Sequence, residues 1–315
     1  MRAGARAAGG ATDAVRVLIT GAGGFVGRHV ARLLVAEGDR VAGTYWAECL
    51  EIPGVELHEA DVRDRASVER VVRGVRPEVV IHLAGLSHVG QSWDRPGCYF
   101  AVNVLGTENV VRAAGGARVL VASSADVYGA VPEDEQPIAE DRPLAPGTPY
   151  GLTKAAAERL AVALAGEAAV VVRSFNLIGP GQARDFALPS FAAQLAAIRR
   201  GEAEPVLSVG NLSARRDFVH VEAAARAYVL LARRGEPGTA YNLASGRALA
   251  IEEVLEALVR ASGVEARVER DPVRFRPVDL PLLCGDPGRL RALGWEPEPG
   301  VEEAIEGLWR EAAGI

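Results

Sequence analysis

Tyr150 and Lys154 are the residue pair with the clearest capacity for chemistry. They lie in the segment 148–154, which reads TPYGLTK, and a threonine followed by a proline predicts the first turn of a helix. A spacing of four places both side chains on one face of that helix. A nearby ammonium group and the positive helix end favour a phenolate, so they lower the pKa of a phenol from its usual value of about 10. The pair therefore predicts a tyrosine that exchanges a proton with a substrate hydroxyl or carbonyl group.

Lys154 is also the only lysine of the chain, in which Lys and Arg together number 35. Arginine is a planar fork that stays charged, whereas lysine is a compact ammonium group on a flexible stem. A lysine retained in so arginine-rich a chain indicates a position where arginine cannot substitute. The Tyr-x-x-x-Lys spacing alone is common in ordinary helices, so its interpretation depends on the segment that precedes it.

Ser124 is the candidate catalytic hydroxyl in that preceding segment. Residues 119–124, VLVASS, read as a buried strand that ends in hydroxyl groups. Ligands bind beyond the carboxyl ends of the strands in open α/β sheets. A serine at a strand end is often only a turn former, but this one precedes the Tyr–Lys helix. We therefore expect Ser124 to hydrogen-bond the same substrate oxygen as Tyr150.

A glycine-rich loop, residues 20–27 (TGAGGFVG), lies between the first predicted strand and the first predicted helix. Its glycines at 21, 24 and 27 allow a tight turn, a close approach of backbone to phosphate, and close packing of helix on strand. The helix N-terminus adds free N–H groups and positive potential. The loop therefore predicts a bound dinucleotide cofactor.

The elements around these motifs alternate between strands and helices. Helical patterns cover 26–37, 67–73, 104–114 and 155–165, and the second half is more mixed. This βαβα order predicts an α/β fold with a doubly wound parallel sheet, the Rossmann arrangement, and a smaller mixed C-terminal substrate lobe. We expect a flexible tail at 1–14, a dinucleotide-binding domain at 15–176 to which 217–243 returns, and a substrate lobe at 177–315. The predicted strands are 15–20, 40–45, 55–59, 79–83, 119–123 and 170–175.

Composition excludes several classes of protein. The net charge of −6 and pI near 5.6 argue against nucleic-acid binding, and no apolar run is long enough to cross a membrane. Three widely spaced cysteines suit reduced thiols better than disulfides. The histidines show no metal-ligand spacing with the cysteines. We expect a cytoplasmic enzyme without a metal.

The adenosine end of the cofactor is encoded less clearly. NAD sites usually place an acidic residue on the ribose about 20 residues after the glycine loop, but residues 42–46, AGTYW, contain none. Arg28 could reach a 2′-phosphate or be a solvated surface arginine. We therefore expect NADPH or NADH, with NADPH favoured. Asp61 could accept a hydrogen bond from the adenine or simply cap a turn.

The combination of these motifs resembles the extended short-chain dehydrogenases/reductases that modify nucleotide sugars, over essentially the whole chain after residue 14. The resemblance implies Ser124, Tyr150 and Lys154 as the catalytic triad, hydride transfer to or from NAD(P), and a homodimer. The residues expected to bind the cofactor come from the glycine loop, from the ends of two strands and from the Tyr–Lys helix, together with Asn103. They are Gly21, Gly24, Phe25, Val26, Gly27, Arg28, Asp61, Val62, Leu83, Ala84, Gly85, Asn103, Tyr150 and Lys154.

Further stretches narrow the resemblance to GDP-4-keto-6-deoxy-mannose reductases, with GDP-mannose 4,6-dehydratases as close relatives. It implies that Asn176 contacts the sugar diphosphate and that Arg216 and Arg276 clamp its phosphates, because a guanidinium binds phosphate bidentately. A surface ion pair is the competing interpretation for each arginine. Ser87 and Asp126 are further expected substrate contacts. The expected product is GDP-D-rhamnose. The stretches are 83–93, 103–107, 173–182, 209–218 and 274–279.

Three alternatives remain open. Related dehydratases carry Thr-Asp-Glu or Thr-Ser-Glu where this chain has Ser124-Ala125-Asp126, and Ala125 can move no proton, which counts against elimination. The segment 124–129 also resembles that of UDP-galactose 4-epimerases, which keep NAD bound throughout. A non-catalytic dinucleotide-binding regulator is disfavoured because both Tyr150 and Lys154 are present.

Overall fold

The structure is a computed structural model that describes residues 14–275 and 280–315. The predicted tail at 1–14 therefore lies outside the described residues except for Ala14. Arg276, a predicted phosphate ligand, lies outside them as well. Within the described ranges, no helix is both long and apolar enough to cross a lipid bilayer.

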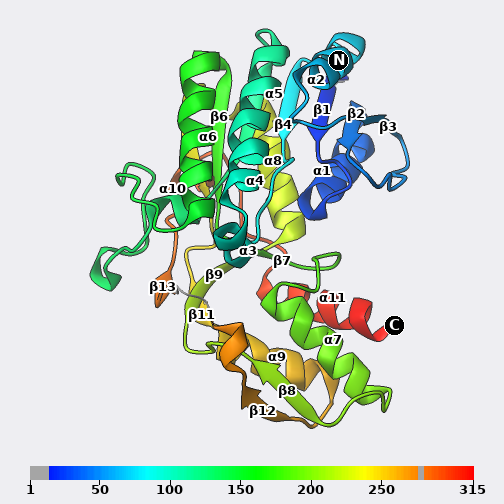
Figure 1. Cartoon of the computed structure of the whole chain (residues 1–315), viewed down its shortest axis with the longest axis vertical. Coiled ribbons are helices and arrows are strands. Elements are labelled where there is room, and N and C mark those ends of the chain that lie inside the picture. Colours follow the sequence, from blue (N-terminus) through cyan, green and yellow to red (C-terminus); the bar gives the residue numbers. More distant parts are fainter. Residues whose placement is uncertain (1–13, 276–279) are drawn as a thin grey trace, which may run out of the picture.

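The larger lobe is built on a seven-stranded sheet in the order β10-β6-β5-β4-β1-β2-β3, and every pairing in it is parallel. Continuous apolar runs such as VVIH, all four residues of which are buried, suit a sheet covered on both faces. The predicted doubly wound parallel sheet is confirmed (Figure 1). Its strands are β1 (Arg16–Thr20), β2 (Arg40–Tyr45), β3 (Val55–Glu59), β4 (Val79–His82), β5 (Arg118–Ser124), β6 (Ala169–Ser174) and β10 (Ala240–Leu243).

Helices cover both faces of this sheet, and β1 shows why. Val17 and Ile19 join one hydrophobic cluster with buried residues of two helices, while Leu18 joins another cluster on the opposite face, because strand side chains alternate in direction. The first face is covered by α1 (Phe25–Ala36) and α8 (Val221–Arg234), and the second by α2 (Arg65–Val75), α5 (Gly106–Ala114) and α6 (Pro149–Ala165).

The strand order reverses between β1 and β4. β1 pairs with β2 on one side and with β4 on the other, so the chain moves outward to β3 and then returns to build the other half. Ligands bind at such a switch point, beyond the carboxyl ends of the strands. The loops that follow β1 and β4 therefore border the same crevice.

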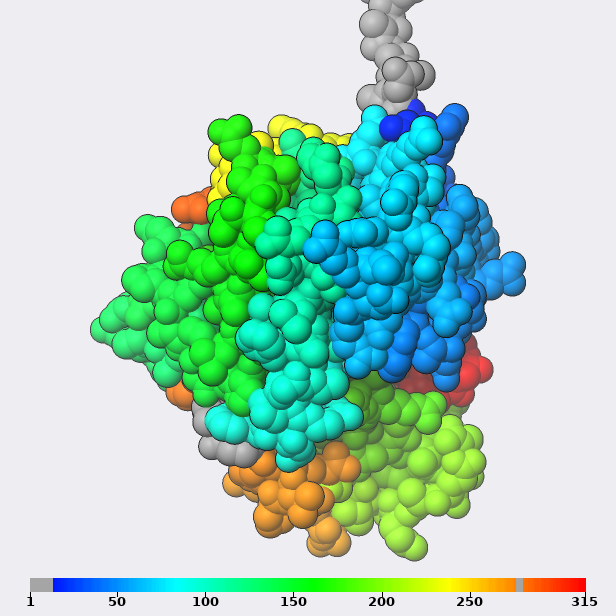
Figure 2. Space-filling model, turned by 45° about the horizontal axis from the view of Figure 1, so that its top comes forward, coloured from blue at the N-terminus to red at the C-terminus, as the bar shows by residue number. Residues whose placement is uncertain are grey.

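The smaller lobe packs below the larger one and appears mainly in light green and orange in Figure 2. It contains a four-stranded sheet, a separate two-stranded pair and a core shared by three helices. Sequence patterns did not predict these strands, because strands of two to six residues carry little periodicity. The elements are β7 (Asn176–Ile178), α7 (Ala187–Arg199), β8 (Val206–Val209), β9 (Arg215–His220), β11 (Ala248–Ala250), α9 (Ile251–Ser262), β12 (Arg267–Arg270), β13 (Leu282–Leu283) and α11 (Val301–Ala313).

Short helices complete the chain around the crevice. One of them is a π-helix, a rare conformation that is often found at functional sites, and it contains Asn103. The short helices are α3 (Val89–Asp94), α4 (Pro96–Phe100), η1 (Ala101–Leu105, the π-helix), η2 (Ala125–Tyr128), η3 (Glu133–Glu135), η4 (Gly166–Ala168), η5 (Pro272–Arg274) and α10 (Gly288–Ala292).

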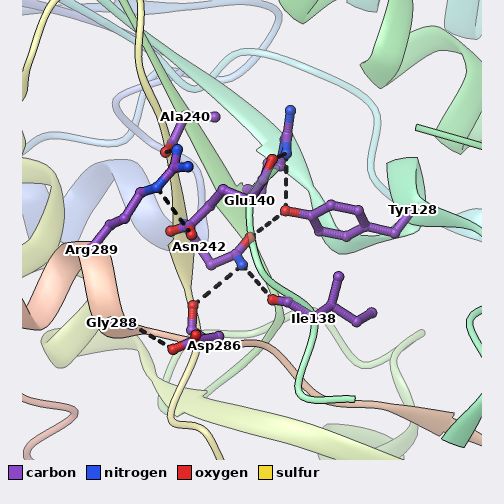
Figure 3. Close-up of polar contacts among 9 residues, drawn as sticks. Tyr128, Ile138, Glu140, Ala240, Asn242, Asp286, Gly288 and Arg289 are labelled. Atoms are coloured by element: carbon purple, nitrogen blue, oxygen red, sulfur yellow. Dashed lines mark hydrogen bonds and ion pairs between the residues drawn. The ribbon is translucent and has the colours of Figure 1, made fainter. Parts of the chain in front are cut away.

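A buried polar network fixes the long segment 129–148 to the edge of the sheet (Figure 3). At its centre Asn242 of β10, which is fully buried, accepts a 2.7 Å hydrogen bond from the Tyr128 hydroxyl and donates one of 2.8 Å to the Ile138 carbonyl. Its backbone N–H donates to Glu140 at 2.9 Å, and Arg289 of α10 pairs with Glu140 at 3.4 Å. The segment is therefore held by buried polar groups although it has little regular structure.

Candidate active site

A cleft of about 530 Å³ lies at the switch point of the sheet and is closed below by the smaller lobe. Its wall combines the glycine loop, the ends of β4, β5 and β6, the start of α6, and the segment after β7. The predicted residues that line it are Gly21, Gly24, Phe25, Val26, Gly27, Leu83, Gly85, Ser87, Ser124, Asp126, Tyr150, Lys154, Asn176 and Arg216.

The glycine loop has the shape of a phosphate cradle. Gly21 has φ +70, and a Cβ on Gly27 would lie 2.3 Å from the Gly21 carbonyl oxygen, so larger residues would fill or strain the turn. The N-cap of α1 is Gly24, which has no capping side chain. The first N–H groups of α1 are thus left for an anion. These features fit the pyrophosphate of a nicotinamide dinucleotide.

The start of α6 places Tyr150 and Lys154 as their spacing predicts. The Thr148 hydroxyl caps the helix by accepting from the Gly151 N–H at 3.0 Å, and the Tyr150 N–H donates to Ser92 Oγ at 3.2 Å. Lys154 Nζ donates to the Ala122 carbonyl of β5 at 2.9 Å. The Lys154 bond therefore ties the helix to β5, the strand that ends at Ser124.

Ser124 stands at the end of β5 and faces Tyr150. Its Oγ donates to Asp126 Oδ2 at 3.2 Å and accepts from the Asp126 N–H at 3.2 Å, and it shares a hydrogen bond with the Tyr150 phenol. The cleft thus brings Ser124, Tyr150 and Lys154 together, with Asp126 beside them.

The titration behaviour of Tyr150 differs from the sequence-based expectation. Burial raises the pKa of the Tyr150 phenol, the Asp126 carboxylate raises it further, and the hydrogen bond with Ser124 acts in the opposite direction. Burial also lowers the pKa of Lys154 to about 8. The expected lowering of the phenol pKa is therefore absent from the free protein, because desolvation and a neighbouring carboxylate both favour the neutral phenol. Tyr150 therefore keeps its proton near pH 7 in the free protein, so it has a proton that it can donate.

Asn103 holds the loop after β4 against α6. Its Oδ1 accepts from the Leu86 N–H at 2.8 Å, and its Nδ2 donates to Thr153 Oγ1 at 3.0 Å. A Cβ on Gly85 would lie 3.3 Å from Lys154 Nζ, so glycine leaves room for the ammonium group there. Asn103 thereby positions the loop that borders Lys154, and direct cofactor binding by Asn103 stays a prediction.

The two residues expected at the adenosine end have other partners in the structure. Arg28 Nη2 donates to the Gly181 carbonyl, on the segment after β7, at 2.6 Å. Asp61 accepts from Arg63 through both carboxylate oxygens, the closest contact being 2.6 Å to Arg63 Nη2. The Arg63 guanidinium in turn lies 5.0 Å from the ring centre of Trp46. Roles for Arg28 and Asp61 in cofactor binding stay predictions.

Sequence reasoning missed Arg63 and Trp46. Trp46 directly follows β2, where the ribose-binding residue of dinucleotide folds is found, and Arg63 lies two residues after Asp61. The positions were available in the sequence, but the stacking of one on the other joins two loops and carries no local signal.

The substrate side of the cleft comes from both lobes. Arg216 of β9 is 6% exposed and donates to the Leu280 carbonyl at 2.7 Å, while Asn176 of β7 lines the same wall. The His88 and Phe186 rings, one from each lobe, lie with their centres 5.6 Å apart across the cleft. Phe186 was not predicted, and Arg276 falls outside the described residues.

Comparisons with known proteins agree on the family. The model of the GDP-mannose 4,6 dehydratase family matches residues 18–308. GDP-6-deoxy-D-mannose reductase of Pseudomonas aeruginosa is 35% identical over 301 residues, which cover 93% of this chain and 95% of that protein. UDP-glucose 4-epimerase of Bacillus subtilis is 32% identical, with 93% of this chain and 96% of that protein covered.

Solved structures add the cofactor. RMD of Pseudomonas aeruginosa, complexed with NADPH, superposes with a TM-score of 0.83 at 32% identity, covering 96% of this chain and 98% of that one. UDP-glucose 4-epimerase of Thermus thermophilus, complexed with NAD, superposes with a TM-score of 0.85 at 32% identity, covering 95% and 99%. The chain therefore belongs to the GDP-mannose 4,6 dehydratase family of extended short-chain dehydrogenases/reductases, and it is an oxidoreductase of that family built to bind a nicotinamide cofactor.

Proposed function

We propose that the protein reduces the 4-keto group of GDP-4-keto-6-deoxy-D-mannose and releases GDP-D-rhamnose. This proposal rests on which acid and base groups line the cleft. Tyr150 is buried in its protonated form beside Ser124, whereas Ala125 stands where a dehydratase needs a proton-moving side chain. A ketone reduction needs one proton donor, and elimination of water needs an acid and a base.

The reaction requires one hydride and one proton. The nicotinamide cofactor, when bound, supplies the hydride to the ketone carbon. Tyr150 donates its phenolic proton to the ketone oxygen, which becomes the new hydroxyl group. Lys154 carries a positive charge below about pH 8, so it stabilises the phenolate that Tyr150 becomes. Bulk solvent returns the proton to Tyr150 after product leaves.

The walls of the cleft suit a nucleotide sugar. Arg216 and Asn176 on the smaller lobe would hold the diphosphate, and Ser87 and Asp126 on the larger lobe would hold the hexose. Arg216 already has carbonyl partners that fix its position, which reduces the entropy lost on binding. Arg276 remains a predicted phosphate ligand.

We propose NADPH as the preferred reductant. No carboxylate occupies the end of β2, where NAD-binding folds place one, and Trp46 stands there with the Arg63 guanidinium stacked on it. Arg63 is a candidate 2′-phosphate ligand in addition to Arg28, because guanidinium groups pair bidentately with phosphate. The described contacts of Arg28 point toward the segment after β7.

We also propose that the protein forms a homodimer. Phe100 of α4, Leu105 of η1 and Leu152 of α6 are 49%, 45% and 57% exposed, and these three helices pack on one another. Exposed apolar side chains on neighbouring helices favour association. Light scattering of the wild type against Leu105→Asp tests it: a dimer that becomes a monomer supports this face, and a monomeric wild type contradicts the proposal.

The reductase is tested by following oxidation of NADPH and NADH on GDP-4-keto-6-deoxy-D-mannose, with the product identified by NMR. Stoichiometric oxidation and a rhamno product are expected. The second candidate is an NDP-sugar 4-epimerase, favoured by its relatives in both comparisons. Nucleotide found bound in the purified protein, with turnover of a UDP- or GDP-hexose and no need for added NADPH, would establish that alternative instead.

A further inference from the structure

His82, the last residue of β4, hydrogen-bonds a threonine on each side of its ring. Its Nδ1 lies 2.7 Å from Thr20 Oγ1 at the end of β1, and its Nε2 lies 3.0 Å from Thr107 Oγ1 on α5. The three residues are 3%, 2% and 2% exposed, respectively. One buried imidazole therefore joins β1 to α5 through β4.

The proton positions in this group follow from counting donors. Thr107 Oγ1 donates its single proton to the Asn103 carbonyl at 2.6 Å, so toward His82 it can only accept, and His82 Nε2 carries a proton. A neutral imidazole has one N–H, so Nδ1 accepts the proton of Thr20 Oγ1. Burial and the charge of Lys154 lower the pKa of His82 to about 3, which agrees with the neutral form.

The Thr20 side of this group fixes the glycine loop against the loop after β4. Thr20 directly precedes Gly21, and its Oγ1 also accepts from the Ala84 N–H at 3.3 Å. A Cβ on Gly21 would lie 3.0 Å from Ala84 N and Cα, so the two loops are in close contact. Their relative position thus depends on a hydroxyl group that His82 orients.

The Thr107 side reaches the start of α6. Asn103, whose carbonyl accepts from Thr107, donates through Nδ2 to Thr153 Oγ1 at 3.0 Å, and Thr153 Oγ1 donates to the Tyr150 carbonyl at 2.8 Å. All of these donors point in the same sense along the chain of contacts. One buried chain of hydrogen bonds therefore runs from the glycine loop, through the imidazole, to the helix that carries Tyr150.

We propose that His82, as its neutral Nε2–H tautomer, is a positioning residue that holds the glycine loop and the loop after β4 in the arrangement that receives the dinucleotide. His82 does not line the cleft, so it acts through the two threonines. Loops that are ordered before binding favour affinity, because the ligand does not have to order them. The proposal concerns cofactor binding and is independent of whether the protein is a reductase or an epimerase.

The tautomer is tested by NMR of protein labelled with ¹⁵N-histidine. A long-range ¹H–¹⁵N spectrum distinguishes a protonated ring nitrogen from a bare one, and comparison with His82→Gln or His82→Asn identifies the His82 signals among those of the five histidines. We expect a protonated Nε2 and a bare Nδ1 near pH 7, unchanged at about pH 5. A protonated Nδ1 at either pH would overturn the proposal.

Two substitutions each remove one side of the imidazole. The amide of glutamine lies near the position of Nε2, so His82→Gln can keep the bond to Thr107 but loses the bond to Thr20. The shorter asparagine does the reverse. We expect His82→Gln to raise the Kd of NADPH and of NADH by about five- to tenfold, the value of one hydrogen bond, and His82→Asn to raise it less. Fluorescence titration measures both, and an unchanged Kd in His82→Gln would contradict the proposal.

Thr20→Val tests the same contact from its other partner, and it replaces the His82 variants if they do not fold. It should also raise the Kd, and adding His82→Gln to it should change the Kd little further, because the contact is already lost. Additive effects would show that His82 acts by another route. His58→Gln on β3 is the control, since His58 pairs with Glu56 at 3.2 Å and does not line the cleft.

Stability and turnover separate this role from others. A variant that unfolds at lower urea concentration but binds the dinucleotide with the Kd of the parent would show that His82 is only structural. If the purified protein retains a nucleotide, its release rate is compared in place of the Kd. A protein that reduces no 4-keto sugar but shows the expected changes in Kd would disprove the proposed function and leave the role of His82 intact.

Discussion

Lys154 of α6 and Arg173 of β6 are two buried cations with opposite surroundings. Lys154, at the cleft, donates to the Ala122 carbonyl at 2.9 Å, and burial lowers its pKa to about 8. Arg173, behind the cleft, is 7% exposed and pairs with Glu158 at 2.8 Å. Burial lowers the pKa of Arg173, but its bonds to Glu158 and Tyr128 more than offset this and raise it. One cation is held in a titratable state and the other is permanently charged.

The surroundings of Lys154 and of Arg173 are linked by one face of α6, called here the α6 stripe, which consists of Tyr150, Lys154 and Glu158. Tyr150, Lys154 and Glu158 follow one another at intervals of four residues along α6, so they lie on the same side of the helix. Glu158 accepts from Ser123 at 2.8 Å as well as from Arg173, which fixes α6 against β5 and β6. The Arg173–Glu158 pair thus fixes the rotation of α6 that turns Tyr150 and Lys154 toward the cleft.

The largest effect on activity is expected at Tyr150, at the cleft end of the α6 stripe. Tyr150→Phe removes the proton donor while keeping the ring, so kcat should fall by about 10²–10⁴-fold with the melting temperature nearly unchanged. Steady-state kinetics on the keto sugar and circular dichroism measure both. A variant that retains most of its activity would remove Tyr150 from the mechanism.

At Glu158, the other end of the α6 stripe, a substitution should lower stability strongly. Glu158→Gln leaves the Arg173 charge buried without its partner, so the free energy of unfolding should fall by about 3–5 kcal/mol, measured in urea. The double variant Glu158→Leu with Arg173→Met should be closer to wild type than Glu158→Gln alone. Glu108→Gln is the control, because its pair with Arg112 is partly exposed and is worth about 0–1 kcal/mol.

The titration of Lys154 separates activity from stability. Since its pKa is about 8, kcat/KM for reduction should fall as pH rises through that value, because the ammonium charge is lost. The unfolded chain keeps that proton up to about pH 10.4, so it binds more protons than the folded chain between the two values. The free energy of unfolding contributed by this group therefore rises with pH in that window.

Whatever activity Lys154→Arg retains should lack the alkaline loss, and its stability should lack the matching pH trend, since arginine stays charged throughout. Its pH profile of kcat/KM and its denaturation curves across the same pH range are the measurements. An alkaline loss of activity that persists in this variant would assign the titration to another group.

The smallest effect is expected at an exposed cation, Arg63, which pairs with Asp61 at 2.6 Å with a side chain 41% exposed. Arg63→Gln should reduce the ratio of NADPH to NADH affinity by about tenfold, the value of one charge-assisted hydrogen bond. Arg65→Gln, on the same surface but paired with Glu69, is the control. Fluorescence titration of each cofactor measures it, and a loss confined to Arg28→Gln would favour Arg28 as the 2′-phosphate ligand.

The sequence by itself determined the local features of this protein. The parallel sheet follows from short apolar runs alternating with helical patterns, and the cradle after β1 follows from glycine spacing. The Tyr150–Lys154 pair follows from helical periodicity and from the single lysine. Each of these signals lies within a few residues along the chain, where backbone geometry and propensity act directly.

The tertiary structure alone decided how distant polar groups meet. The stacking of Arg63 on Trp46, the bond from Arg28 to Gly181, and the Arg173–Glu158 pair each join separate elements. Whether Tyr150 holds its proton was also decided there, because burial and the Asp126 charge depend on which loop the fold brings beside α6. Such pairings depend on strand register and on the docking of loops, which short-range sequence patterns do not encode.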